Sequence, residues 1–342
     1  MMRFKKFSAL TSCLLIILTG CGEKTDNSTK VQRDVFEMDT YMSLTAYGDN
    51  AVDALDNATE IITELESLFA VNSEESDVWK INNSDGKPVQ VSDDTAEIIA
   101  SAIEYGDITG TLDITIYPVL KEWGFTTQDY KIPNDETLAE LLKNVDYSNI
   151  QLNSNNVSVP ESYMIDLGAV AKGYTGDKVI AELKKNGVES AIISLGGNVQ
   201  SLGLKPDGSQ WNVSVANPFT PDTSMCVISI DEKAVITSGN YERYFTGDDG
   251  RNYWHIIDKS DGYPADNGLV SVTIIGNSGI MCDALSTALF IAGTEKAQEY
   301  WRKNGGFDMI LVTDDGRIIC TDGIKDNLKN MSDMPLEVIS VD

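Results

Sequence analysis

The spacing of apolar residues along the chain predicts a mixture of helices and strands. Between residues 49 and 69, apolar side chains recur every three or four positions, as they do on the buried face of an amphipathic helix. Ser92 is placed to cap a second helix, because its hydroxyl can accept a hydrogen bond from the first turn. The helices predicted by this spacing cover residues 49–69, 93–105, 137–143, 175–185, 279–292 and 294–303.

The strand pattern is concentrated in separate runs. Residues 31–48 are predicted to form a strand or hairpin, and residues 156–165 form a strand-like run, rich in Val and Ser, that leads into a turn. Because helical and strand runs do not alternate strictly, and neither a repeat nor a linker divides them, we expect one large α+β domain. Further strands are predicted over residues 190–194, 211–216, 225–230, 234–238, 253–258 and 269–275, with a terminal hairpin over residues 309–313 and 317–320.

The N-terminal residues have the pattern of a targeting segment. A basic start precedes a short apolar run over residues 7–18, which is too short for a comfortable membrane-spanning helix. The sequence LTGC follows, and its Cys21 stands where a bacterial lipobox has its lipidated cysteine. We therefore expect residues 1–20 to be a cleaved lipoprotein signal peptide, residues 21–30 a polar tether and residues 31–342 the folded domain. An ordinary signal peptide with an incidental cysteine is the alternative.

Composition narrows the class of protein. With 42% hydrophobic and 23% charged residues, the 342-residue chain can bury a substantial core. A net charge of −27, from 26 basic and 53 acidic side chains, argues against nonspecific binding to nucleic acid. A phosphate ester would need a metal ion, a lysine or backbone N–H groups to offset that charge. Cys226, Cys282 and Cys320 have no C-x-x-C spacing, so neither a zinc site nor a disulfide scaffold is indicated, although one disulfide stays open.

A strand-to-helix turn at residues 165–174 carries the first candidate chemistry. It contains two glycines, small residues and Lys172, and the predicted helix at residues 175–185 follows it directly. Glycine lets a ligand approach the backbone, and the free N–H groups at a helix start favour a phosphate. The turn matches no general phosphate-loop motif, so an ordinary tight turn with a surface lysine is the alternative.

Two oxygen-bearing side chains share a face of the helix predicted at residues 279–292. Asp283 and Thr287 are four positions apart, which places them on the same side of that helix. A carboxylate and a hydroxyl suit Mg²⁺, which also keeps several waters and often binds substrate phosphate. The alternative is an acidic residue that interacts with the helix dipole and a threonine bonded to its own helix.

His255 is the only histidine in the chain, which makes it a candidate for ligand contact or proton transfer. It lies between apolar residues, and Asp258 and a Gly-Tyr-Pro turn follow it. A structural role is the alternative. A single histidine cannot form a His-rich zinc site, and the chain contains neither the G-x-x-x-x-G-K-[ST] phosphate loop nor the G-x-S-x-G elbow.

Taken together, these segments resemble the FAD:protein FMN transferases, the ApbE-type flavin transferase family. The resemblance extends from about Val31 to Asp322, and its motifs occur in the order found in that family. The motifs are MDT at residues 38–40, GTLD at 110–113 with WGF at 123–125, DLGAVAKG at 166–173, LGGN at 195–198, TSGNY at 237–241, HIID at 255–258 with GYP at 262–264, and DALST at 283–287.

The resemblance implies the fold of that family and an activity. FAD would bind in a cleft with Mg²⁺ at its pyrophosphate, its FMN moiety would pass to a Ser or Thr hydroxyl of an acceptor protein, and AMP would leave. The backbone carbonyl of Ala169 would join Asp283 and Thr287 as metal ligands, and His255 and Asp283 are the candidate catalytic residues. The FAD site would be lined by Met38, Thr111, Leu112, Asp113, Asp166, Lys172, His255 and Ile257.

One residue in the segment after the first helix bears on whether a protein hydroxyl or water accepts the FMN moiety. The family often has a tyrosine near the flavin there, and loop spacing aligns that position with Asn72, a further expected FAD-site residue. A small polar residue at this point is associated with hydrolysis of FAD to FMN and AMP. We expect transfer, with hydrolysis or flavin binding without turnover as alternatives. The implied partners are acceptor flavoproteins of membrane respiratory complexes or extracellular electron transfer, met by a lipid-anchored enzyme on the outer face of the cytoplasmic membrane.

Overall fold

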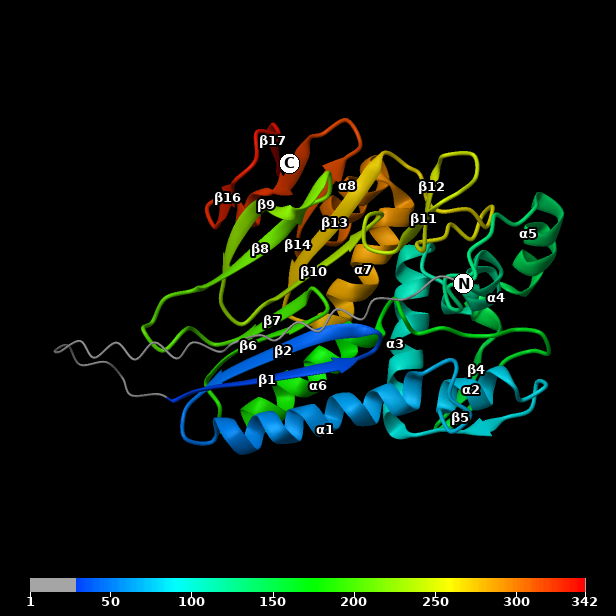
Figure 1. Cartoon of the computed structure of the whole chain (residues 1–342), viewed down its shortest axis with the longest axis horizontal. Coiled ribbons are helices and arrows are strands. Elements are labelled where there is room, and N and C mark those ends of the chain that lie inside the picture. The colour runs from blue at the N-terminus through cyan, green and yellow to red at the C-terminus, as the bar shows by residue number, and fades with distance from the viewer. Residues whose placement is uncertain (1–28, 342) are drawn as a thin grey trace, which may run out of the picture.

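A nine-stranded sheet organises residues 29–341, the part of the chain that the computed structural model describes (Figure 1). Neighbouring strands are antiparallel except for the last pair, β15 and β17. In spatial order the strands are β1 (Lys30–Glu37), β2 (Thr40–Tyr47), β6 (Ser190–Leu195), β7 (Asn198–Leu202), β10 (Ala234–Gly239), β13 (Leu269–Gly276), β14 (Asp308–Thr313), β15 (Ile318–Thr321) and β17 (Leu336–Ile339).

Helices cover one face of this sheet, and Figure 1 shows α6 and α7 behind the strands. α1 (Ala51–Phe69) and α6 (Ala171–Lys185) share a core with β2 and β6. α7 (Gly279–Ala292) and α8 (Thr294–Asn304) share a second core with β13 and β14. The apolar stripe that predicts each helix is the stripe buried in these cores, because an amphipathic helix is stabilised mainly by burial of that face.

A small sheet covers the opposite face of the C-terminal strands. It consists of β8 (Trp211–Asn217), β9 (Thr220–Ile230) and β16 (Leu328–Asn330), and it packs on β13, β14 and β15. All eight residues of β13 are buried as a result. A strand covered on both faces needs no polar side, which explains its nearly continuous apolar sequence, LVSVTIIG.

Short elements extend the molecule beyond one end of the main sheet, on the right of Figure 1. Among residues 29–341, no helix is long and apolar enough to cross a membrane. The remaining helices are α2 (Asp77–Asn82), α3 (Asp93–Thr109), α4 (Tyr117–Trp123) and α5 (Asp135–Leu141). The remaining strands are β3 (Val89–Gln90), β4 (Gln151–Asn153) and β5 (Asn156–Ser158) in one sheet, and β11 (Tyr244–Thr246) and β12 (Asn252–Trp254) in another.

The elements with the strongest periodicity agree with the sequence. β1 and β2 form the predicted hairpin, and α7 covers the predicted residues 279–292. The Ser92 hydroxyl caps α3 by accepting the Thr95 N–H at 3.1 Å, as expected. The α+β class is therefore confirmed. The predicted signal peptide and most of the tether lie outside the described residues.

Two predicted strands are shorter than expected. The run at residues 156–165 forms a strand only as far as Ser158. Ile165 then pairs with a side chain, because its N–H donates to Asn82 Oδ1 at 2.6 Å and its carbonyl accepts Asn82 Nδ2 at 2.9 Å. The run at residues 253–258 leaves β12 after Trp254 and continues as an irregular turn. At Ile165, hydrogen bonds to a side chain 83 residues away replace the ladder of a regular strand.

Candidate functional site

A cavity of about 750 Å³ opens where the β1–β2 hairpin tip, the first turn of α6, the cavity side of α7 and the end of β10 converge. These segments are far apart in the sequence, so the cavity exists only in the folded chain. It gathers nearly all of the residues predicted for the site. They are Met38, Thr111, Leu112, Asp113, Asp166, Ala169, Lys172, His255, Ile257, Asp283 and Thr287.

The segment before α6 forms a tight turn that hydrogen bonds of Asp166 stabilise. The Asp166 N–H donates to Ile114 O at 2.8 Å, and its carboxylate accepts the Gly168 N–H at 2.8 Å. Burial raises the pKa of the Asp166 carboxyl. The turn delivers Lys172 into the first turn of α6, whose N-cap residue, Val170, has no side-chain cap. The Ala171 N–H is bonded to Leu167 O at 2.8 Å and the Gly173 N–H to Asp283, so this turn offers an anionic ligand the Lys172 side chain and the positive end of the helix dipole.

Asp283 lies where α7 meets α6. It is only 4% exposed, and its Oδ2 accepts the Gly173 N–H at 2.8 Å. Burial raises the pKa of the Asp283 carboxyl, and the neighbouring Lys172 opposes that rise. A buried carboxylate is costly unless hydrogen bonds and positive charge surround it, so a cation would stabilise this one.

Thr287 follows one helical turn after Asp283, on the cavity side of α7 as the spacing predicts. Its hydroxyl lies 3.2 Å from Ser238 Oγ on β10. Ser238 Oγ also lies 2.8 Å from Ser286 Oγ. The end of β10 therefore orients the hydroxyl groups that α7 presents near the cavity.

An unpaired amide stands beside Asp283. Asn198 is 4% exposed, lines the cavity and interacts with the Asp283 carboxylate, but its Nδ2 makes no hydrogen bond of good geometry. Buried polar groups without a partner are rare, and they often mark the place of an ion, a water or a ligand. The amide is thus placed to donate to an oxygen that arrives with a ligand.

The donors around Asp283 suit Mg²⁺. Within residues 29–341, no three His, Cys, Asp or Glu side chains form a metal-binding group. An ion at Asp283 would therefore depend on the Ala169 carbonyl, the Thr287 hydroxyl and oxygens from water or substrate. Magnesium accepts such a set, because it prefers oxygen ligands and often shares one or two carboxylates with phosphate.

His255 is held in one tautomer. Its Nδ1 lies 3.2 Å from the Arg243 carbonyl, which can only accept, so Nδ1 carries the proton and Nε2 has the free lone pair. Burial, together with the nearby Arg243 and Lys172 cations, lowers the pKa of His255 from 6.5 to about 4. The neutral ring can accept a proton at Nε2 within the cavity.

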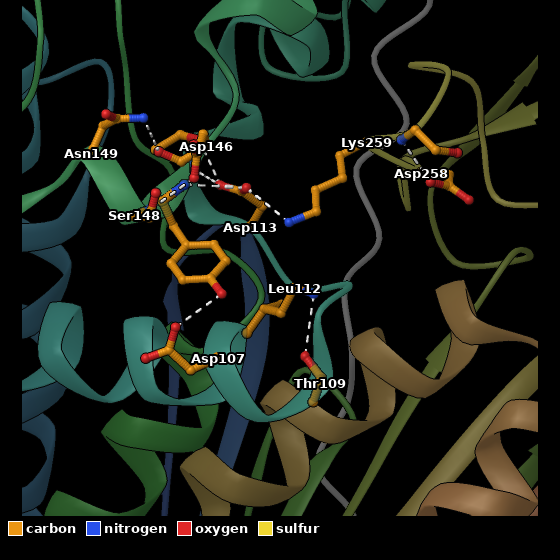
Figure 2. Close-up of polar contacts among 12 residues, drawn as sticks. Asp107, Thr109, Leu112, Asp113, Asp146, Ser148, Asn149, Asp258 and Lys259 are labelled. Atoms are coloured by element: carbon orange, nitrogen blue, oxygen red, sulfur yellow. Dashed lines mark hydrogen bonds and ion pairs between the residues drawn. The ribbon is translucent and has the colours of Figure 1, made fainter.

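Hydrogen bonds and an ion pair hold Asp113 in the wall of the cavity (Figure 2). Its Oδ1 accepts the Thr115 N–H at 3.0 Å and the Thr115 hydroxyl at 2.6 Å. Its Oδ2 lies 3.2 Å from Lys259 Nζ and 3.3 Å from Tyr147 N. Lys259 also lies over the Tyr147 ring, 5.0 Å from its centre. Asp113 therefore joins the segment after α3 to the segment after His255.

The other predicted residues complete the wall. The Thr111 hydroxyl donates to Ala288 O at 2.9 Å and so binds this segment to α7. Leu112 and Ile257 are buried apolar residues, 2% and 5% exposed. Met38, at the hairpin tip, has a φ of 51°, a left-handed conformation that costs a non-glycine residue free energy.

Aromatic side chains form another part of the wall. Phe125 and Tyr130 line the cavity. Tyr130 stacks on Phe245, with ring centres 5.0 Å apart and an angle of 17° between the planes. Aromatic rings of this kind suit a flat conjugated ligand, because stacked rings bury a large apolar area.

Asn72 does not fit the prediction. It is exposed in the turn after α1 and is not among the residues that line the cavity. Its expected place rests on loop spacing alone, and spacing does not determine the path of an irregular turn.

Several polar residues that line the cavity were not predicted from the sequence, among them Asn198, Glu242, Arg243 and Lys259. Burial raises the pKa of the Glu242 carboxyl to about 7. Arg243 and Lys259 give the cavity two cations besides Lys172. Asn198 ends the LGGN motif, Glu242 and Arg243 follow TSGNY, and Lys259 follows HIID, so the polar residues at the ends of these motifs were the available signal.

Comparison with known proteins identifies the class. Residues 38–311 match the model of the ApbE family. The chain belongs to the ApbE family.

Two individual relatives and one solved structure are similar to this chain over most of its length. The FAD:protein FMN transferase of Klebsiella pneumoniae (strain 342) is 34% identical over 266 residues, which cover 76% of this chain and 82% of that protein. The FAD:protein FMN transferase of Treponema pallidum (strain Nichols) is 30% identical over 295 residues, 81% of each chain. The crystal structure of the ApbE protein from Thermotoga maritima superposes with a TM-score of 0.82 at 30% identity, covering 87% of this chain and 99% of that one.

Proposed function

We propose that this protein transfers the FMN moiety of FAD to a Ser or Thr hydroxyl of an acceptor protein and releases AMP. The observation that carries the proposal is the cavity in which Lys172, Asp283, Thr287 and the unpaired Asn198 amide converge beside a neutral His255. The names of the relatives support the same activity.

The first turn of α6 would bind the pyrophosphate of FAD. The Lys172 side chain and the positive end of the α6 dipole supply positive charge in a protein whose net charge is −27. The Asn198 Nδ2 would donate to an oxygen of the same group, which satisfies its buried N–H. The rings of Phe125 and Tyr130 offer a wall for the flavin.

Asp283, Thr287 and the Ala169 carbonyl would hold Mg²⁺. When bound, Mg²⁺ would neutralise charge on the pyrophosphate during phosphoryl transfer. Ser238 would keep the Thr287 hydroxyl turned toward the site, and Gly173 would do the same for the Asp283 carboxylate.

His255 would accept the proton of the attacking hydroxyl. The acceptor oxygen forms a bond to the FMN phosphorus, and the bond from that phosphorus to the bridging oxygen breaks, leaving its electron pair on AMP. The hydroxyl proton passes to Nε2, the nitrogen that the Arg243 carbonyl leaves free. The imidazole is neutral at neutral pH because its pKa is about 4, so Nε2 is unprotonated when the substrate binds.

The acceptor decides between transfer and hydrolysis. In hydrolysis, water replaces the protein hydroxyl and releases FMN. Incubation with FAD, Mg²⁺ and a candidate acceptor separates the outcomes. Flavin bound covalently to the acceptor supports transfer, free FMN with AMP supports hydrolysis, and unchanged FAD indicates binding only. Acceptors in membrane respiratory complexes or extracellular electron transfer would suit a lipid-anchored enzyme, for which the LTGC sequence at Cys21 is the support.

Replacing Asp283 tests the proposed metal site. We predict that Asp283→Ala loses about 10²–10³-fold in Mg²⁺-dependent turnover, because a charged group that stabilises the transition state is removed. Thr287→Ala should lose less, since water can replace a neutral ligand. Turnover is measured against Mg²⁺ concentration, together with a melting curve.

Asp283→Asn is the matched control for folding. Asparagine keeps an oxygen that can accept the Gly173 N–H but lacks the charge. It should melt closer to wild type than Asp283→Ala while losing turnover similarly. If Asp283 serves only the helix dipole, both variants would lose about 0.3–1 kcal/mol of stability and keep wild-type turnover and Mg²⁺ dependence. That result would exclude the metal assignment.

A further inference from the structure

α6 and α7 exchange aspartates near their starts, and each carboxylate accepts N–H groups from the first turn of the other helix. Asp283 of α7 accepts the Gly173 N–H of α6 at 2.8 Å. In the other direction, Asp177 of α6 accepts the Gly279 N–H at 2.6 Å through Oδ1 and the Ile280 N–H at 3.0 Å through Oδ2. Each helix thus caps the other with a carboxylate, at the end where free N–H groups and the helix dipole favour negative charge.

The exchange is possible because the two backbones touch. A Cβ added to Gly173 would overlap the Gly279 carbonyl oxygen, and one added to Gly279 would overlap the Gly173 carbonyl oxygen. The buried side chain of Gln200 closes the gap from β7, donating to Gly173 O at 3.2 Å. With backbone against backbone, a displacement of either helix start is passed directly to the other, because neither can yield by changing a side-chain rotamer.

Asp177 is fully engaged in this contact. Its Oδ2 also accepts the Ser278 hydroxyl at 3.1 Å, so three donors from the start of α7 converge on one carboxylate. Asp177 does not line the cavity. Its influence on ligands must therefore pass through α7, where Asp283 lies four residues, about one turn, beyond Gly279.

We propose that Asp177 is a positioning residue that holds the metal-binding face of α7, Asp283 and Thr287, against the start of α6. Without its carboxylate, the N–H groups of Gly279 and Ile280 lose their acceptor, and the first turn of α7 moves to find another. Asp283 then departs from Lys172 and from the Ala169 carbonyl. The inference rests on the metal site proposed above.

Metal binding without turnover tests this role. Mn²⁺, with ADP as a pyrophosphate that carries no flavin, is titrated into the full chain and free Mn²⁺ is followed by electron paramagnetic resonance. Asp177→Ala should weaken Mn²⁺ binding by about 10–100-fold, the usual effect of removing a group that orients a metal ligand. The Mg²⁺ concentration for half-maximal turnover should rise similarly, with turnover recovering at high Mg²⁺. Asp177→Asn, which keeps one acceptor oxygen, should lie between Asp177→Ala and wild type.

Thr321→Val is the matched control for stability. Thr321 is also buried and bridges two groups, accepting the Met309 N–H at 3.1 Å and donating to Asp308 Oδ1 at 2.8 Å, but it lies on β15 and does not line the cavity. This variant should melt at a lower temperature and bind Mn²⁺ as wild type does. If both folded Asp177 variants also bind Mn²⁺ as wild type does, the inference is wrong. If Asp177→Ala does not fold, Asp177→Asn decides alone.

Asp283→Asn separates this inference from the function on which it rests. Loss of Mn²⁺ binding in Asp283→Asn together with wild-type binding in the Asp177 variants overturns only the positioning role. Wild-type Mn²⁺ binding in Asp283→Asn overturns the proposed metal site, and the positioning role with it.

Discussion

His255 shows how a single contact sets the chemistry of a residue. The Arg243 carbonyl lies 3.2 Å from Nδ1 and also accepts the His255 backbone N–H at 3.1 Å. A carbonyl cannot donate, so the ring must present Nε2 to the cavity as an acceptor. The same environment, buried and close to two cations, disfavours the charged ring.

The lowered pKa predicts how His255 affects stability in acid. The pKa is about 4 in the folded protein and 6.5 in the unfolded chain, so below about pH 6.5 the unfolded chain binds a proton that the folded protein does not. Stability should therefore fall as the pH decreases from about 6.5 to 4. His255→Gln should remove this component, which urea unfolding at pH 7 and pH 5 measures.

The difference between wild type and His255→Gln reports the contribution of the histidine alone. Burial raises the pKa of Asp166 and Asp283, so these carboxyls act in the opposite direction and favour the folded state as the pH falls. They are present in both proteins and cancel in the difference. Equal losses of stability for wild type and His255→Gln between pH 7 and pH 5 would contradict the assignment.

At the scale of elements, the crossing of α6 and α7 assembles the site. It places the start of one helix, with Lys172, against the side of another, with Asp283. The close approach depends on glycine, because any side chain at Gly173 would meet backbone atoms of α7. The site is therefore sensitive to changes that add volume at this crossing.

Gly173→Ala tests that sensitivity. A glycine-to-alanine change within a helix normally stabilises by about 0.4–1 kcal/mol. Here the added methyl group would overlap the Gly279 carbonyl, and we expect a loss of about 1–3 kcal/mol from overpacking instead. Urea denaturation measures the free energy of unfolding.

Gly106→Ala in α3 is the matched comparison. Its added Cβ would meet only the Tyr147 ring, at 2.9 Å, and a side chain can move where a backbone cannot. This variant should be closer to wild type in stability. If Gly173→Ala is as stable as Gly106→Ala, close backbone contact is not what limits the crossing.

At the scale of the whole molecule, charge is distributed unevenly. The chain carries −27, yet Lys172, Arg243 and Lys259 all line one cavity. Five carboxylates line the same cavity (Asp39, Asp113, Asp166, Glu242 and Asp283), so these cations offset local acidic charge, and a divalent cation would add to the positive charge available to a pyrophosphate.

The proposed lipid anchor also acts at this scale. Cys21, outside the described residues, would tether the domain through a polar segment that ends at β1. We predict that Cys21→Ser appears in the soluble fraction or accumulates as an uncut precursor, because anchoring needs the attached acyl chains. Fractionation with a molecular-mass measurement checks this. A fully cut Cys21→Ser protein retained on the membrane would contradict it.

Local patterns in the sequence were sufficient to predict the main helices and strands and one pair of site residues. The three- and four-residue spacing of apolar side chains predicts α1 and α7, since a helix repeats over that distance wherever it packs. The same geometry predicts that Asp283 and Thr287 share a face. Motif order pointed to the family and, through it, to nine other residues that line the cavity.

Contacts between residues far apart in the sequence determined the features that local patterns cannot predict. Asp177 and Gly279 are 102 residues apart, and nothing near either one indicates that they bond. Asn82 replaces a strand partner for Ile165 across 83 residues, which shortens a predicted strand. Asn72 lies outside the cavity wall because an irregular turn has no repeating geometry from which its path follows. Periodicity reports which face of an element is buried, whereas the partner that buries it depends on contacts that form only when the whole chain folds.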